Sequence, residues 1–122
     1  MATILVVDDS NLSRKTSRRI LESSGYQVID VADGMAALER YALDRPDVVL
    51  LDVTMAGMSG LEVLEQLRAM DSEARVVMAT ADVQSSTREM AKAGGAVGFV
   101  TKPFAAEHVL AAVAAALQGA AL

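Results

Sequence analysis

Residues 4–10 read ILVVDDS and residues 48–52 read VVLLD, and these two segments are the most informative about the fold. Both are short apolar runs without alternation between apolar and polar residues. Strands of this composition lie inside parallel sheets that are covered on both faces. Each run ends in aspartate. We therefore expect a buried parallel sheet whose strands carry acidic groups at their carboxyl ends.

The rest of the chain continues this pattern, because further apolar runs alternate with segments of helical length. Gly25, Pro46 and the pair Gly94-Gly95 fall between the elements. The alternation predicts a doubly wound α/β fold with a five-stranded parallel sheet of order 2-1-3-4-5, a flavodoxin-like (βα)5 three-layer sandwich. The expected strands are residues 3–7, 27–31, 48–51, 75–79 and 97–100, and the expected helices are residues 11–23, 35–43, 61–70, 83–93 and 105–117.

Composition narrows the class of protein. The chain has 122 residues, of which 52% are hydrophobic, and this is enough for one domain with a core. It contains no cysteine, which excludes disulfides and thiolate metal sites. Its net charge of −5 argues against direct binding of nucleic acid. No apolar run reaches the length of a membrane span and no signal peptide is evident. We expect one cytoplasmic domain without membrane insertion.

Four of the five expected strands are followed by a chemically useful side chain. The first is followed by Asp8 and Asp9, the third by Asp52, the fourth by Thr80 and the fifth, after one residue, by Lys102. In a sheet of order 2-1-3-4-5 the first and third strands are adjacent, so the three carboxylates are expected in one pocket. Three neighbouring carboxylates need a cation, and oxygen ligands favour Mg²⁺, with Mn²⁺ as a possible substitute.

The same set of residues predicts phosphoryl chemistry. Mg²⁺ retains water ligands and accepts phosphate oxygens. The hydroxyl of Thr80 and the ammonium of Lys102 can stabilise the other oxygens of a transferring phosphoryl group. Asp52 lies between these groups, which makes it the expected nucleophile.

Each of these side chains also has an ordinary structural explanation when it is taken alone. Asp9 or Ser10 can cap the first helix. Asp52 can end a strand in a solvated turn, and Thr80 can be a simple strand hydroxyl. Lys102 can be a solvated loop charge. Their occurrence together at one edge favours the functional interpretation.

Four segments resemble the receiver domain of two-component response regulators. They are ILVVDDS at 4–10, VVLLDVTMAGMSGLEVL at 48–64, VVMATA at 76–81 and GAVGFVTKPF at 95–104. They occur in the right order and cover nearly the whole chain. The resemblance implies one receiver domain over residues 1–122, similar to stand-alone chemotaxis-type regulators, with no output domain.

The resemblance also implies roles for the acidic residues. Asp52 accepts a phosphoryl group from a histidine kinase or a histidine phosphotransfer protein. Asp9 and Asp52 ligate Mg²⁺ directly, Asp8 acts through a bound water, and the backbone carbonyl of Thr54 is a further ligand. A receiver of this kind is a signalling phosphoacceptor, from which only self-phosphorylation and autodephosphorylation are expected.

The remaining implied roles concern the response to phosphorylation. Lys102 pairs with the phosphoryl group, Thr80 moves toward it, and the Phe99 ring swings inward. This repacks the surface of the fourth helix, the fifth strand and the fifth helix, where a downstream protein target binds. Thr54 and Asp82 occupy positions that tune the rate of dephosphorylation in the family.

The chain departs from the family pattern at two positions. Ala56 stands where a proline is usual, which predicts a less rigid loop after Asp52 and an altered affinity for Mg²⁺. Phe99 stands where many members have tyrosine, so output through a tyrosine hydroxyl is excluded.

Two other functions remain as alternatives. One is a receiver fold that serves as a scaffold without phosphorylation. The other is a Mg²⁺-dependent phosphohydrolase with an aspartyl-phosphate intermediate, but Thr54 occupies the place of the second aspartate that such enzymes use as general acid. Dinucleotide binding is excluded, because no glycine fingerprint follows the first strand.

The sequence also makes predictions for several residues outside the acidic cluster. His108 is expected at the surface, and one face of the last helix, formed by Val109, Leu110, Val113, Ala116 and Leu117, is expected in the core. A basic stripe on the first helix is either a solvated face or a docking surface for the phosphodonor. The stripe consists of Arg14, Lys15, Arg18 and Arg19. Residues expected to fill the core or pack loops are Met35, Met55, Met58, Met70, Met78 and Met90. An apolar face of the fourth helix is expected from Val83, Thr87, Met90 and Ala91.

Overall fold

The computed structural model describes residues 1–81 and 85–119. In this part of the chain five strands alternate with five helices. The strands are β1 (Thr3–Val7), β2 (Gln27–Val31), β3 (Val48–Asp52), β4 (Val76–Thr80) and β5 (Gly98–Thr101). The helices are α1 (Asn11–Ser23), α2 (Gly34–Asp44), α3 (Gly60–Met70), α4 (Ser85–Ala93) and α5 (Ala106–Leu117).

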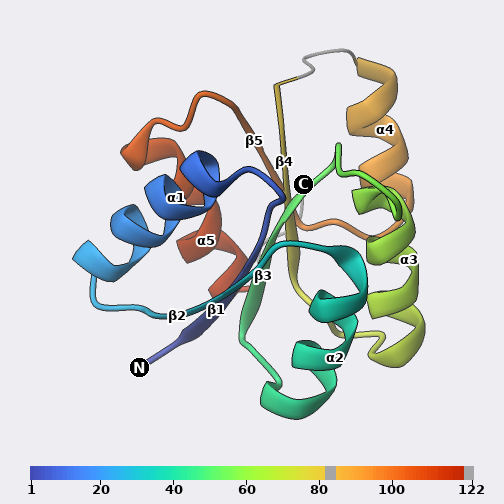
Figure 1. Ribbon diagram of the computed structural model, residues 1–122, viewed down its shortest axis with the longest axis horizontal. Coiled ribbons are helices and arrows are strands. Elements are labelled where there is room, and N and C mark those ends of the chain that lie inside the picture. Colours follow the sequence, from blue (N-terminus) through green and yellow to red (C-terminus); the bar gives the residue numbers. More distant parts are fainter. Residues whose placement is uncertain (82–84, 120–122) are drawn as a thin grey trace.

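The strands form one parallel sheet of order β2-β1-β3-β4-β5, as the sequence predicts. Figure 1 shows α1 and α5 on one face of this sheet and α2, α3 and α4 on the other. The strand order reverses between β1 and β3, which pair directly through the register Ile4↔Val48 to Val7↔Leu51. Ligands of such sheets bind beyond the carboxyl ends of the strands at this point of reversal.

Alternate residues of each strand explain why both faces are covered. Leu5 and Val7 of β1 point to the core beneath α2, α3 and α4, whereas Ile4 and Val6 point to the core beneath α1 and α5. All four are at most 1% exposed. Because β1, β3 and β4 are apolar at both sets of positions, they occupy the middle of the sheet.

Side chains of the connecting segments fix where three helices begin. The Ser10 hydroxyl accepts a hydrogen bond from the Ser13 N–H at the start of α1, and Asp33 caps α2 in the same way. Ser59 and Glu62 form a reciprocal capping box at the start of α3. The α3 cap anchors the far end of the loop that follows Asp52.

The structure moves three strand ends by one residue relative to the prediction. Asp52 and Thr80 are the last residues of β3 and β4 and do not follow them, and β5 ends at Thr101. The reason is backbone pairing, which does not depend on side-chain polarity: Asp52 pairs with Ala79, and Thr80 with Thr101. The polar groups are thereby held by the sheet itself.

The predicted apolar face of the fourth helix is partly wrong. Val83 lies outside the described residues, Ala91 is buried, and Met90 is 58% exposed. Met35 and Met70 are also exposed, whereas Met55 and Met78 are buried as expected. A flexible apolar side chain on a short helix does not by itself identify which face is covered.

Other predictions for the helices are confirmed. In α5, Val109, Val113 and Ala116 are buried, with Leu110 and Leu117 packed beside them, and His108 is exposed. Within the described ranges, no helix combines the length and the apolar composition needed to cross a bilayer.

Candidate functional site

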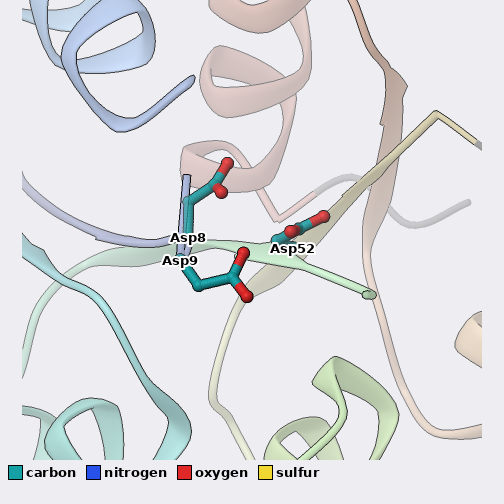
Figure 2. Close-up of side chains that lie close together, drawn as sticks. All are labelled: Asp8, Asp9 and Asp52. Atoms are coloured by element: carbon teal, nitrogen blue, oxygen red, sulfur yellow. The ribbon is translucent and has the colours of Figure 1, made fainter. Parts of the chain in front are cut away.

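Three carboxylates meet at the carboxyl ends of the two central strands. Asp8 and Asp9 directly follow β1, and Asp52 ends the adjacent β3. One oxygen from each carboxylate lies within 4.8 Å of the others. Figure 2 shows the three side chains gathered at this edge of the sheet. The predicted acidic cluster is therefore present.

Lys102 supplies a positive charge to this cluster from the end of β5. Its Nζ lies 2.8 Å from Oδ2 of Asp8 and 3.4 Å from Oδ2 of Asp52. The Lys102 N–H donates to the Thr80 carbonyl at 2.8 Å, which continues the β4–β5 pairing past the last strand residue. The sheet thus carries both Thr80 and Lys102 to the edge where the acids lie.

The environment of Asp52 makes its ionised form costly. Asp52 is 5% exposed. Burial and the nearby charge of Asp8 raise the pKa of Asp52 to about 6. Lys102 and a hydrogen bond from the backbone of Thr54 act in the opposite direction on this pKa but do not cancel the rise. A second positive charge at this edge would favour the ionised carboxylate.

Asp8 and Asp9 differ in exposure and in how they are held. Asp8 is 2% exposed, and its Oδ1 accepts a hydrogen bond from the Ser10 N–H at 2.9 Å. Asp9 is exposed, and its Oδ2 accepts a hydrogen bond from the backbone N–H of Ala56 at 3.1 Å. Asp9 is therefore tied to the loop that follows Asp52.

A cavity of about 500 Å³ opens beside these groups. Its wall brings together five of the residues singled out from the sequence and adds one, Ala81. The lining residues are Asp9, Asp52, Thr54, Thr80, Ala81 and Lys102. A phosphoryl group and a hydrated metal ion are small enough for a cavity of this size.

Phe99 lies outside this cavity. It is half-buried on β5 and packs against the core beneath α2, α3 and α4. The guanidinium of Arg88, on α4, lies over its ring at 4.9 Å from the centroid. The predicted rotation of Phe99 stays a prediction, and the ring is in contact with Arg88 of α4.

The four residues of the basic stripe on α1 have different surroundings in the structure. Arg14 donates to the backbone carbonyl of Asp8 at 2.7 Å, so it helps to fix the backbone at Asp8. Arg18 forms ion pairs with Glu22 and Asp30. Among the described residues, Arg18 is the member of the stripe with acidic partners, because Arg14 bonds to neutral oxygens of Asp8 and Asn11 and no ion pair of Lys15 or Arg19 is present. Whether the stripe is a solvated face or a docking surface for the phosphodonor stays a prediction.

Sequence reasoning missed two groups that hold the acids. One is Arg14, which donates to the backbone carbonyl of Asp8. Arg14 is part of the basic stripe, and helical spacing alone does not distinguish it from the other basic residues there. The N–H of Ala56 leaves no sequence signal at all, because every residue except proline carries this donor.

The donor set fits a hard divalent cation. Three carboxylates meet within reach of one another, and Lys102 balances only one of their charges. All the side-chain ligands are oxygens, which suits Mg²⁺ or Mn²⁺ and not metals that favour thiolate or imidazole. Asp8, Asp9 and Asp52 are the residues that could hold such an ion.

Comparison with known proteins agrees with this fold and identifies the family. The family described as the response regulator receiver domain matches residues 4–114. Response regulator MprA of Mycobacterium ulcerans is 43% identical over 115 residues, which cover 94% of this chain and 50% of that protein. The chain spans about half the length of the curated relatives it matches.

Solved structures of response regulators have the same fold. Chemotaxis protein CheY4 of Vibrio cholerae has a TM-score of 0.89 and 34% identity over 93% of this chain and 97% of that one. A LuxR-family two-component response regulator from Aurantimonas has a TM-score of 0.94 and 33% identity over 99% of this chain and 88% of that one. The chain belongs to the response regulator receiver domain family.

Proposed function

We propose that this chain is a phosphoacceptor in which Asp52 receives a phosphoryl group from a phosphohistidine in a Mg²⁺-dependent reaction. The observation that carries the proposal is the position of Asp52: buried, 3.4 Å from Lys102, and facing a cavity that Thr80 and Asp9 also line. The phosphodonor is a histidine kinase or a histidine phosphotransfer protein, as expected for a receiver domain.

The chemical step is an in-line displacement at phosphorus. A carboxylate oxygen of Asp52 forms the new O–P bond while the N–P bond to the donor histidine breaks, and the imidazole nitrogen keeps the electron pair and takes up a proton. A bound Mg²⁺ would neutralise charge on the phosphoryl oxygens and on the carboxylates. The residues suited to hold it are Asp8, Asp9, Asp52 and the backbone carbonyl of Thr54.

Lys102 and Thr80 stabilise the transferred group. The Lys102 ammonium already contacts the Asp52 carboxylate and can shift to an oxygen of the product without leaving the site. The Thr80 hydroxyl lies on the same cavity wall and can donate to a second oxygen. An Mg²⁺ ion and Lys102 together balance the charge of about −2 that a phosphoryl group brings.

The product changes the protein surface through β4, β5 and α4. Thr80 ends β4, and Phe99 lies on β5 beneath Arg88 of α4. Movement of Thr80 toward the phosphoryl group frees space for the Phe99 ring to turn inward, which repacks the surface of α4, β5 and α5. A downstream protein reads that surface. We assign a cytoplasmic location on the ground of the family alone.

The experiment is to incubate the protein with acetyl phosphate and Mg²⁺ and to measure intact mass. One added phosphoryl group is expected, and EDTA prevents it. Asp52→Asn abolishes the adduct, whereas Asp47→Asn, at an exposed carboxylate away from the cavity, leaves it unchanged. An adduct that persists at another residue in Asp52→Asn would contradict the assignment of the nucleophile.

Two assays separate the alternatives. Sustained turnover of a phosphomonoester substrate at steady state would establish a phosphohydrolase in place of a receiver. If instead no adduct forms with either acetyl phosphate or a phosphorylated histidine donor while the fold is intact, the chain is a phosphorylation-independent scaffold. Single-turnover labelling at Asp52 supports the proposal.

A further inference from the structure

Asp9 is held differently from the other two acids of the cluster. Asp8 and Asp52 share the ammonium of Lys102, whereas Lys102 forms no ion pair with Asp9. Among the described residues, the hydrogen-bond partner of the Asp9 carboxylate is the backbone N–H of Ala56, 3.1 Å from Oδ2. A neutral backbone donor therefore orients the most exposed carboxylate of the site.

The loop that carries this donor is fixed at both ends. It leaves β3 after Asp52 and enters α3 at Gly60, whose N–H donates to the Val53 carbonyl at 2.8 Å. The Ser59 cap holds the start of α3. A methyl group at Gly60 would lie 2.0 Å from the carbonyl oxygen of Asp52, so the two ends of the loop approach as closely as glycine allows.

We propose that the backbone N–H of Ala56 is a positioning group that holds Asp9 in place for a divalent cation. This rests on the proposed function, in which Asp9 is a ligand of that ion. The bond uses Oδ2, so Oδ1 remains available for the metal. The N–H also stabilises the negative charge of the Asp9 carboxylate. This reduces the repulsion among the three carboxylates before the ion binds.

The proposal assigns the effect to the backbone and not to the side chain of residue 56. The Ala56 side chain lies on an exposed loop, so its replacement by another residue that keeps the N–H leaves cation binding unchanged. Only a change that removes the N–H releases Asp9. Proline removes it but adds a ring that restricts the loop, whereas a backbone ester removes the N–H alone.

The test is to replace Ala56 by lactic acid, which turns its N–H into an ester oxygen, and to measure Mg²⁺ binding by isothermal titration calorimetry. The ester weakens Mg²⁺ binding about three- to tenfold, the range for losing one hydrogen bond to a partly solvated carboxylate. The matched control, Ala56→Ser, binds Mg²⁺ like the unmodified chain. Equal affinity of the ester and the unmodified protein would overturn the proposal.

A second measurement covers the case in which the ester protein does not fold. Amide hydrogen exchange of Ala56 in the metal-free protein is slow, and it accelerates in Asp9→Ala while the amide of Gly60, bonded to Val53, keeps its rate. An unchanged rate at Ala56 in Asp9→Ala would also overturn the proposal.

The two proposals fail in different ways. Absence of Mg²⁺ binding to the unmodified protein would contradict the proposed function and this inference together. Mg²⁺ binding that is normal in both the unmodified protein and the ester would contradict only the role of Ala56, and labelling of Asp52 by acetyl phosphate would then be unaffected.

Discussion

Lys102 lies closer to Asp8 than to Asp52, with its Nζ 2.8 Å from the first carboxylate and 3.4 Å from the second. One ammonium therefore serves two buried acids that come from adjacent strands. Asp52 and Lys102 both line the cavity at this edge of the sheet. The Lys102 ammonium thus offsets the charge of two buried carboxylates and lies beside the cavity in which the proposed reaction takes place.

Replacing Lys102 by Met removes the charge that both acids share. We expect Lys102→Met to lower the free energy of unfolding at pH 7 by about 1–3 kcal/mol, because two buried carboxylates lose their partner. Labelling by acetyl phosphate slows at least about tenfold, since one stabilising charge is lost. Urea denaturation and intact mass measure the two effects. Lys92→Met, at an exposed residue of α4, is the control and changes neither.

Asp52→Asn is expected to stabilise the metal-free protein. The pKa of Asp52 is about 6 in the folded state against 3.8 for a free side chain, so the folded state binds this proton more tightly than the unfolded state does. The contribution of Asp52 to stability is therefore present below pH 4 and is lost as the pH rises to about 6. At pH 7 the Asn variant is more stable by about 1–3 kcal/mol.

Urea denaturation in EDTA at pH 4.5 and pH 7 measures this difference. The gain in stability of Asp52→Asn over the unmodified protein is larger at pH 7 than at the lower pH. A gain of equal size at the two values would contradict the raised pKa of Asp52. Comparing the two proteins at each pH cancels the contributions of titrating groups that do not interact with Asp52.

Gly60→Ala is expected to damage the site through the backbone. A methyl group there would meet the carbonyl oxygen of Asp52 at 2.0 Å, so the end of β3 or the start of α3 must move. We expect a loss of stability of about 2 kcal/mol or more and slower labelling of Asp52.

Gly57→Ala is the matched control for Gly60→Ala. Gly57 lies in the same loop with φ of 80°, and a methyl group there meets no atom within 4 Å. The control should cost about 1 kcal/mol for its left-handed backbone and leave labelling intact. Equal labelling rates for the two variants would show that the Gly60 contact does not position Asp52.

Tyr41→Phe tests a contact between α2 and the end of α3. Tyr41 is 3% exposed and its hydroxyl donates to Oδ2 of Asp71 at 2.7 Å, which together with burial raises the pKa of Tyr41 to about 12. Removing the hydroxyl costs about 1–2 kcal/mol in urea denaturation, since a hydrogen bond to a charged acceptor is lost. Tyr26→Phe is the control, because within the described residues the Tyr26 hydroxyl has no partner, and it should cost little.

Much of the fold could be predicted because period and apolarity are local properties of the chain. The unbroken runs around Leu5 and Val49 demand cover on both faces of the sheet, and that requirement sets a parallel sheet with helices on each side. The strand order and the meeting of Asp8, Asp9 and Asp52 follow from the same pattern. Met90 was mispredicted because apolarity does not state which face of a short helix is covered.

The pattern of apolar runs and acidic residues is therefore enough to predict which strands form, how they are ordered and which acidic side chains reach the same edge. How these acids are held becomes visible only in the folded chain. Lys102 divides its charge between Asp8 and Asp52, Arg14 supports Asp8 through a carbonyl, and Ala56 binds Asp9 through an N–H. The physical reason is that periodicity specifies the direction of a side chain to within a face, whereas a hydrogen bond requires atoms from distant segments to meet within about 3 Å.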